Sequence, residues 1–375
     1  MKILKIIGIV ILLLALVVIG LYFFLMYKSN NLKNTKDLEA RIDKLVAEKI
    51  KQKQLKGIVI GIVTPDKVFI KGFGLVSDNS TDVPDSSTIF ELASIGKLFT
   101  TSVLQMGVSR GDFDLNDKIS KHLASKVAVS NACTATLLNL ATHTSGFPSL
   151  PKNMLDKMQD EQNPYKNLQI SDLYDYLKTC NENKAIGDCE YSNFGMGVLG
   201  HILELKYNKK YEDIVKTEIC NPLKMTNTTI NLSPERGKKL AQGYDQQGLP
   251  NPVWQDPVLQ GAGSFLSNAE DMVKFIKANL DENYSPISPN LMACHTPQLN
   301  GETGLGWHLA NTFVDNLVGI KGLVWHNGGA GGYSSYLAID KKTKSGLIIL
   351  SNSANDVTEL GQRIMQGVKN ISFEK

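Results

Sequence analysis

The sequence predicts a mixed α/β (α+β) domain in which helices flank one antiparallel sheet and an all-helical lobe is inserted between its strands. Two observations lead to this prediction. Short apolar runs rich in β-branched residues lie near both ends of the chain, and the long stretch between them has the pattern of helices and loops. The composition, with 42% hydrophobic and 21% charged residues, is that of a globular protein rather than a disordered one.

The N-terminal segment is apolar enough to cross a bilayer. No charged residue interrupts Ile6 to Tyr27, and a membrane helix needs about 20 apolar residues. The run ends in large side chains, without the small-residue cleavage site of a secretory signal peptide. We therefore predict an uncleaved anchor over residues 1–28, followed by a polar linker at 29–36. Lysines lie on both sides of the run, so flanking charge alone does not fix its orientation.

A helix and a hairpin are predicted next. From Asp37 to Gln54 the apolar residues recur at helical spacing, which indicates an amphipathic helix. Ile58–Val63 is a short apolar run, typical of a strand that is buried on both faces. A turn at Pro65 leads into a second strand over Val68–Phe73, so the two strands should form a hairpin.

The middle of the chain is predicted to be mainly helical. Leu98 to Met106 is apolar on all sides and should be a buried helix. Thr134 to about Leu280 has the pattern of helices and loops. These segments place an inserted helical lobe at roughly 115–280, within one domain that covers 37–375.

The C-terminal part should complete the sheet. Three candidate strands lie at Leu323–His326, Tyr333–Ile339 and Leu347–Leu350. Asp356 can begin a last helix, whose apolar face extends to Val368. Strands from the two ends of the chain can pair into one antiparallel sheet, with the terminal helices on one face and the helical lobe against the other.

Charge and cysteine content bear on several functional classes. The net charge of +3 and the lack of a basic, aromatic-rich stripe argue against nucleic acid as a partner. Five cysteines form neither a disulfide framework nor a C-x-x-C metal or redox motif, so neither a metal nor a cofactor is implied. Cys180 and Cys189 flank a short polar loop; they are either a small disulfide or two unrelated thiols.

The first candidate catalytic element is Ser94 with Lys97, at the start of the predicted buried helix. Residues at i and i+3 share one helix face, so a lysine with a lowered pKa could take the serine's proton. The alternative is a plain helix cap beside an exposed lysine. Ser149 with Lys152 and Ser372 with Lys375 have the same spacing, but neither pair opens a buried helix.

The second element is Tyr191-Ser192-Asn193. In an extended segment, Tyr191 and Asn193 would point the same way, so a phenol and a carboxamide could face one cavity. The phenol could relay a proton, and the amide could hold a substrate carbonyl. Tyr165-Lys166-Asn167 has the same form in a more polar loop, and we interpret it as a chance match.

The third element is His326-Asn327-Gly328-Gly329, at the end of a predicted strand. Glycines at a strand edge often mark the close approach of a ligand or another backbone. The alternative is a histidine at a strand end beside a flexible loop. Lys344-Ser345-Gly346 could imitate such a motif, but it falls in a hairpin turn.

These three elements, in this order, resemble the serine β-lactamase and penicillin-binding superfamily. The similarity is greatest to class C β-lactamases and their D-alanyl-D-alanine carboxypeptidase, D-aminopeptidase and esterase relatives, and it extends from about Asp37 to Asn370. Further segments that resemble family motifs are Leu140–Pro148, Asn221–Thr226, Gly261–Ser267 and Gly304–Trp307.

The resemblance implies an acyl-serine mechanism with assigned roles. Ser94 would be the nucleophile, and Lys97 and Tyr191 would together act as the base. Tyr191 would then return the proton to the leaving group. The N–H groups of Ser94 and Gly329 would form the oxyanion hole.

The resemblance also implies substrate contacts. Asn193 would bind the substrate's amide, and His326 would line the opposite wall with Gly328. His143, which lies in one of the shared segments, is interpreted as structural. Class C β-lactamases have lysine where His326 stands, whereas histidine is found among the peptidase and esterase relatives. A mostly neutral histidine cannot hold a substrate carboxylate as lysine does, so efficient antibiotic hydrolysis is in doubt.

Three functional hypotheses therefore stand. The leading one is a hydrolase of small-molecule or peptide amides, either β-lactams or D-amino-acid peptides. The alternatives are an esterase of loose acyl specificity and a β-lactam or cell-wall sensor that is acylated without turnover. The family's substrates lie outside the cytoplasm, which favours a single-pass membrane protein with an extracytoplasmic catalytic domain.

Overall fold

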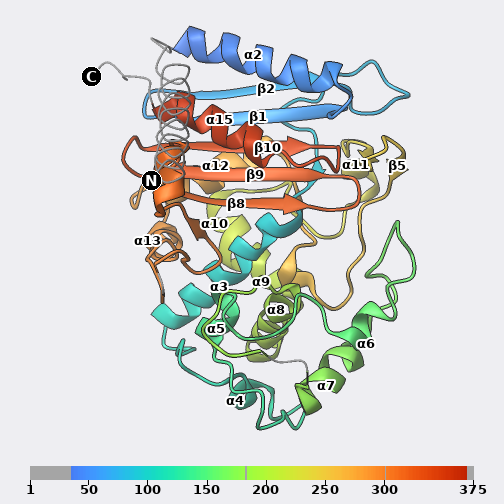
Figure 1. Cartoon of the computed structure of the whole chain (residues 1–375), viewed down its shortest axis with the longest axis vertical. Coiled ribbons are helices and arrows are strands. Elements are labelled where there is room, and N and C mark those ends of the chain that lie inside the picture. Colours follow the sequence, from blue (N-terminus) through green and yellow to red (C-terminus); the bar gives the residue numbers. More distant parts are fainter. Residues whose placement is uncertain (1–34, 182–183, 300, 370–375) are drawn as a thin grey trace, which may run out of the picture.

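The computed structural model describes residues 35–181, 184–299 and 301–369, and these are built around one antiparallel sheet (Figure 1). The strands of the sheet lie in the order β2-β1-β10-β9-β8-β7. In chain order their bounds are β1 Gly57–Val63, β2 Val68–Gly74, β7 His308–Leu309, β8 Leu323–Gly329, β9 Ser334–Asp340 and β10 Ser345–Ser351.

The two ends of the chain meet in the middle of this sheet. β1 pairs antiparallel with β10, so that Ile60 lies opposite Ile349. Every residue of β1, β9 and β10 is buried, as expected for central strands covered on both faces. The predicted pairing of N-terminal and C-terminal strands is confirmed, because burial on both faces selects the continuous apolar runs.

Helices cover both faces of the sheet (Figure 1). α2 (Thr35–Lys51) and α15 (Thr358–Lys369) contact each other and pack on one face, where Ile42, Ile364 and Val368 belong to one apolar cluster. On the other face, α12 (Ala269–Leu280) packs against β1 and β10. A side chain at Gly346 would come within 2.4 Å of Ile276, so glycine is what allows α12 to approach β10 this closely.

The chain between β2 and β7 supplies a helical region below the sheet in Figure 1, built around α3 and α8. α3 is almost entirely buried, which confirms the predicted internal helix. Besides α12, the α-helices described in this stretch are α3 Lys97–Ser109, α4 Ile119–Leu123, α5 Leu137–Ala141, α6 Lys152–Leu155, α7 Ile170–Thr179, α8 Asn193–Tyr207, α9 Tyr211–Val215, α10 Asn221–Leu223, α11 Pro234–Gly237 and α13 Ser288–Ala293.

The remaining elements are short. β3 pairs with β6 and β4 pairs with β5, each as a separate two-stranded sheet. A five-residue helix, α14, lies between β7 and β8. The bounds of these elements are β3 Phe90–Glu91, β4 Gly243–Tyr244, β5 Pro250–Asn251, β6 Leu266–Ser267 and α14 Phe313–Leu317. Two short 3₁₀ helices, η1 Ala93–Gly96 and η3 Gln260–Ala262, and one π-helical turn, η2 Lys216–Cys220, complete the described elements.

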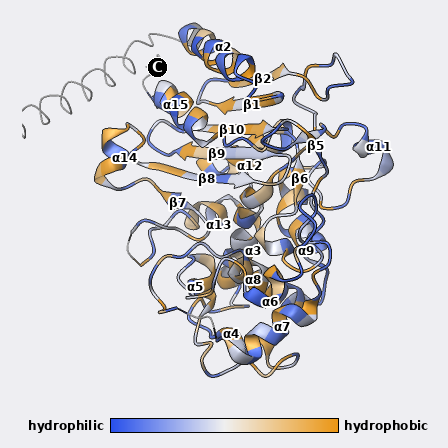
Figure 2. Ribbon diagram, turned by 45° about the vertical axis from the view of Figure 1, so that its right-hand side comes forward, coloured by the Kyte–Doolittle hydropathy of each residue, from blue (hydrophilic) through white to orange (hydrophobic). Residues whose placement is uncertain are grey.

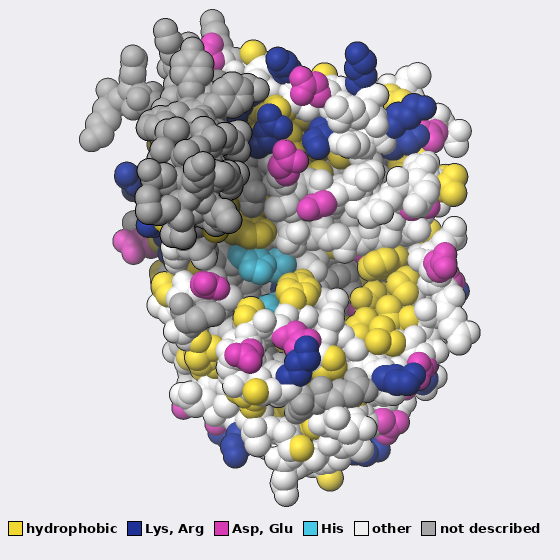
Figure 3. All heavy atoms as spheres, in the orientation of Figure 1, with side chains coloured by type: hydrophobic (Ala, Val, Ile, Leu, Met, Phe, Trp, Pro, Cys, Tyr) yellow, Lys and Arg dark blue, Asp and Glu magenta, His cyan; other side chains and the backbone are white. Residues whose placement is uncertain are grey.

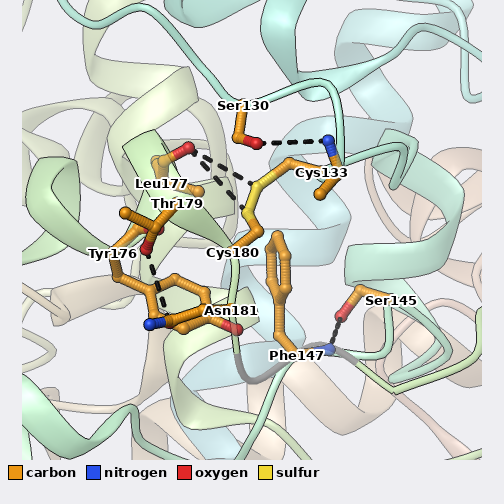
Figure 4. The surroundings of a disulfide bond; sticks show 10 residues. Ser130, Cys133, Ser145, Phe147, Tyr176, Leu177, Thr179, Cys180 and Asn181 are labelled. Atoms are coloured by element: carbon orange, nitrogen blue, oxygen red, sulfur yellow. Dashed lines mark hydrogen bonds between the residues drawn. A yellow bond between two sulfur atoms is a disulfide. The ribbon is translucent and has the colours of Figure 1, made fainter.

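The disulfide differs from the one considered from the sequence. Cys180 is bonded to Cys133, with their Cα atoms 5.8 Å apart (Figure 4). Cys189 is a free, exposed thiol. Cys180 ends α7 in a left-handed conformation, and this helix end lies against the loop that carries Cys133. Of the two alternatives considered, a Cys180–Cys189 disulfide and two unrelated thiols, the structure excludes the disulfide and gives Cys180 a different partner. Proximity in sequence does not decide which side chains face each other across a packed interior.

The predicted anchor at 1–28 and linker at 29–36 lie outside the described residues, apart from the last two linker positions, which begin α2. Across residues 35–181, 184–299 and 301–369, the structure contains no helix with the length and hydropathy needed to span a bilayer.

Candidate active site

Ser94 lies in a tight turn that links β3 to the buried helix α3. The residue before it, Ala93, has a φ of 47°, a left-handed conformation that costs energy for a residue with a side chain. The turn is held from both sides. The Leu92 N–H donates to the Phe265 carbonyl at 2.8 Å, and the Ser335 hydroxyl on β9 donates to the Leu92 carbonyl at 2.7 Å. The surrounding fold thus fixes the strained turn that carries the serine.

Lys97 is fully buried and its amine has three oxygen neighbours. Its Nζ lies 2.9 Å from the Ser94 hydroxyl, 2.8 Å from Asn193 Oδ1 and 2.5 Å from the Ala262 carbonyl oxygen. Burial holds the lysine pKa well below its usual value, and only the charge of Asp256 opposes this shift. A neutral amine has two hydrogens and one lone pair. The two carbonyl oxygens can accept both hydrogens, which leaves the lone pair directed at the Ser94 hydroxyl.

Tyr191 completes the group around the serine. Its phenol is hydrogen-bonded to the Ser94 side chain, and its ring lies 4.8 Å from Lys97 Nζ. Burial raises the pKa of the phenol above its ordinary value, so the group is protonated at neutral pH. The structure therefore brings Ser94, Lys97, Tyr191 and Asn193 together. Asn193 is the first residue of α8 rather than part of a longer extended segment.

His143 holds the Tyr191 segment at three successive residues. Its carbonyl accepts the Glu190 N–H at 2.7 Å, its Nδ1 accepts the Ser192 N–H at 3.1 Å, and its ring lies 4.5 Å from the Tyr191 ring. Burial lowers the histidine pKa to about 3, so Nδ1 remains an acceptor at neutral pH. A structural role was predicted for His143, and these contacts show that it supports the segment of the candidate catalytic tyrosine.

His326 lies inside β8 and is buried. Its Nδ1 contacts the Asn327 carbonyl at 2.5 Å, and its ring lies 6.2 Å from Tyr191 and 5.1 Å from His308. Burial lowers its pKa well below the ordinary value, which leaves the imidazole neutral. Figure 3 shows a group of histidine side chains near the middle of the face of the molecule that is viewed in Figure 1.

The two glycines of β8 differ in their surroundings. A Cβ on Gly328 would come within 2.4 Å of the Leu92 carbonyl and 3.1 Å of the Ser94 nitrogen, so only glycine allows β8 to pass this close to the serine turn. A Cβ on Gly329 would meet nothing within 4 Å, because this residue borders the open cleft.

The cleft beside Ser94 is small, with a volume of about 50 Å³. Its lining residues are Glu91, Ala93, Ser94, Tyr165, Asn193, Trp254, Asp256, Ala262, Gly263, Ser264, Gly329 and Ala330. No lysine or arginine is among these described lining residues, although two carboxyl groups are. Substrate bound here would meet a wall with acidic but no basic side chains.

Four of these lining residues were not identified as site residues from the sequence. Tyr165, interpreted as a chance match, is hydrogen-bonded to the Asn193 side chain, and burial raises its pKa to about 12. Trp254 lies beside it, with ring centroids 5.5 Å apart. Burial raises the pKa of Glu91 to about 8 and that of Asp256 to about 6. Irregular loops carry all but Glu91, and loops give no periodic signal in a sequence.

In this arrangement of a strained serine, a buried lysine and a tyrosine, a neutral amine lies where it could activate the serine hydroxyl as a nucleophile. A family model described as beta-lactamase matches residues 42–368, and the chain belongs to this family.

Curated relatives agree with this assignment. Protein flp of Staphylococcus aureus (strain N315) is 26% identical over 331 residues, which cover 85% of this chain and 64% of that protein. The chain thus spans less than two thirds of the length of this relative. A beta-lactamase of Psychrobacter immobilis is 24% identical over 358 residues, which cover 86% of this chain and 85% of that protein.

Solved structures show the same fold. A class C beta-lactamase matches with a TM-score of 0.78 and 20% identity, over 90% of this chain and 97% of that one. A protein titled beta-lactamase/D-alanine carboxypeptidase, from Pseudomonas syringae, matches with a TM-score of 0.75 and 21% identity, over 90% of this chain and 99% of that one. The predicted class C β-lactamase-like α/β fold is confirmed.

Proposed function

We propose that the protein hydrolyses an amide, either a β-lactam or a D-amino-acid peptide, through an acyl-serine intermediate. The observation that carries this proposal is the buried Lys97 amine, 2.9 Å from the Ser94 hydroxyl and lowered in pKa by burial. A serine hydroxyl is a weak nucleophile until a base removes its proton, and a neutral lysine at this distance is such a base.

The reaction begins when Ser94 Oγ attacks the substrate carbonyl carbon and its proton passes to Lys97. The N–H groups of Ser94 and Gly329 stabilise the oxyanion that forms, and Asn193 holds the substrate's amide. Tyr191, whose phenol contacts the Ser94 side chain, relays the proton to the leaving nitrogen as the amide bond breaks. Water then attacks the acyl-serine carbonyl, which releases the acid and restores the Ser94 hydroxyl.

A second candidate function, an esterase of loose acyl specificity, is supported by the charges around the cleft. His326 is buried and neutral, and the described lining holds Glu91 and Asp256 without a lysine or arginine. A substrate carboxylate has no fixed cation to bind there, whereas a neutral ester needs none. The remaining alternative is a sensor that is acylated by β-lactams but releases the acyl group very slowly.

We further propose that residues 1–28 anchor the protein in a membrane as a single-pass helix, with the catalytic domain on the extracytoplasmic side. The uninterrupted apolar sequence from Ile6 to Tyr27 supports the anchor. The extracytoplasmic location of β-lactam and cell-wall substrates supports the orientation.

The test is to incubate the full chain with benzylpenicillin and follow its intact mass over time. We expect an adduct with the mass of the antibiotic that is absent in Ser94→Ala and retained in Ser149→Ala, where the exposed serine has the same spacing to a lysine. Rapid loss of the adduct with accumulating product indicates a β-lactamase, and slow loss indicates a peptidase or a sensor.

A parallel assay uses a nitrophenyl ester and a D-alanyl peptide. If no penicillin adduct forms and only the ester is hydrolysed in a Ser94-dependent manner, the esterase replaces the amide hydrolase as the function. If Ser94→Ala keeps full activity on every substrate, the acyl-serine mechanism is wrong.

A further inference from the structure

An apolar surface lies on and just after the short helix α14. Phe313, Val314, Leu317 and Val318 expose 75%, 63%, 37% and 42% of their surfaces. Figure 2 shows α14 at the edge of the molecule, with strongly hydrophobic residues along it. Exposed apolar residues are common singly, but four within six consecutive positions mark a contact surface. We call these four residues the α14 patch.

The α14 patch is held in place by hydrogen bonds. The Thr312 side chain and the Asp315 carboxylate form a reciprocal cap at the start of α14. After the helix, the Ile320 N–H donates to the Asp315 carbonyl at 2.9 Å, and the Gln366 amide of α15 donates to the Val318 carbonyl. The apolar side chains are therefore presented to solvent by an ordered segment.

The patch lies at the same end of the molecule as the start of α2. The Lys369 amine, in the last turn of α15, donates to the Lys321 carbonyl just after the patch at 2.6 Å. α15 in turn runs antiparallel to α2, because Arg41 contacts the Arg363 carbonyl whereas Lys49 faces Glu359. The beginning of α2 is thus directed toward the end of α15 that contacts the α14 segment.

This position places the patch near a bilayer. The apolar sequence Ile6–Tyr27 ends eight residues before α2 begins at Thr35. A fully extended chain spans about 3.4 Å per residue, so a span of eight residues keeps the start of α2 within roughly 27 Å of the end of the apolar run. A tether this short holds the α14 end of the domain close to the membrane surface.

We propose that the α14 patch is a second membrane contact, which inserts its apolar side chains into the outer part of the lipid bilayer. This inference rests on the proposed anchor and is independent of the proposed chemistry. β8 runs from Leu323, just after the patch, to Gly329 at the cleft, and seven strand residues span roughly 20 Å. The cleft therefore lies at the other end of β8 from the proposed contact.

The test places a tryptophan in the patch of the full chain. The variant is Phe313→Trp. Its control is Leu249→Trp, because Leu249 is 62% exposed and lies in the β4–β5 hairpin. Both variants are reconstituted in vesicles of phosphatidylethanolamine and phosphatidylglycerol. Lipids brominated in the acyl chain should quench roughly half of the added emission at position 313, because interfacial side chains sit about 5–10 Å deep. They should leave the added emission at position 249 unchanged.

Each outcome decides between the proposals. If the chain floats with vesicles but the emission at position 313 is quenched no more than that at position 249, the patch does not contact lipid and the inference is overturned. The same holds if cross-linking shows position 313 covered by a second copy of the chain. If the chain does not float with vesicles, the anchor proposal fails together with this inference. If the full chain hydrolyses none of the assayed substrates but the emission at position 313 is still quenched, only the proposed function is overturned.

Discussion

Two segments of this molecule share one sequence pattern and differ in their chemistry. Ser94 and Lys97 have the same spacing as Ser149 and Lys152. Lys97 is fully buried among oxygen atoms and its pKa is lowered, whereas Lys152 is exposed and bound to the Asp156 carboxylate at 2.7 Å. The comparison shows that the spacing of three residues only places a serine and a lysine near each other. Burial is what lowers the pKa of Lys97 and makes it a candidate base, because removing water disfavours the charged ammonium.

The largest effect is expected where the buried base is lost. Lys97→Arg should lower kcat/KM by about 10³-fold or more, because a guanidinium stays protonated and cannot accept the serine's proton. The matched change Lys152→Arg keeps an exposed cation and should leave kcat/KM unchanged. Steady-state kinetics on the best substrate from the proposed assays measure both. If the two substitutions lowered kcat/KM equally, burial would not distinguish the pair of Ser94 and Lys97 from the pair of Ser149 and Lys152.

A smaller effect is expected at His143, which holds the segment that carries Tyr191. His143→Ala removes the ring against Tyr191 and the acceptor for the Ser192 N–H, and should lower kcat by roughly 10- to 100-fold with little change in KM. His143→Asn should restore part of kcat, because its amide oxygen can accept the same N–H and asparagine tolerates the left-handed φ of 58°.

Thermal unfolding separates the two roles of His143. If His143→Ala and His143→Asn lose stability and activity in parallel, the residue is merely structural. If the asparagine variant regains kcat out of proportion to its melting temperature, His143 positions Tyr191.

The smallest effect is expected at Asp256, whose negative charge opposes the lowering of the Lys97 pKa. Asp256→Asn keeps an acceptor for the N–H groups of Val258 and Leu259 but removes the negative charge that raises the lysine pKa. The proposed base is the neutral amine of Lys97, so activity is expected to fall as pH drops through the lysine pKa. Lowering that pKa further should move the acid limb of kcat/KM to lower pH, by about 1 unit or less.

The pH profile of kcat/KM measures this change, and Asp156→Asn, which alters the partner of Lys152, is its control. If the acid limb of the kcat/KM profile stays at the same pH in Asp256→Asn, Asp256 does not affect the pKa of Lys97.

Much of the fold could be predicted because the central strands are apolar throughout and the outer helices have one apolar face. The hairpin of β1 and β2, the buried α3 and the strands β8 to β10 all follow from such local patterns. The disulfide between Cys133 and Cys180 could not be predicted, since 47 residues separate the two cysteines and only the packing of α7 brings them together.

The sequence by itself determined the family, the order of the three motifs and the residue types that they bring. Only the tertiary structure decided which of several similar motifs is a site. It separated the Ser94 pair from the Ser149 pair by the burial of Lys97, moved Tyr165 from a chance match to the cleft wall, and set Glu91 and Asp256 in the same cleft as Ser94. The physical reason is that pKa values, hydrogen bonds and clefts depend on distances in space, which loops far apart in sequence create only when the whole core is packed.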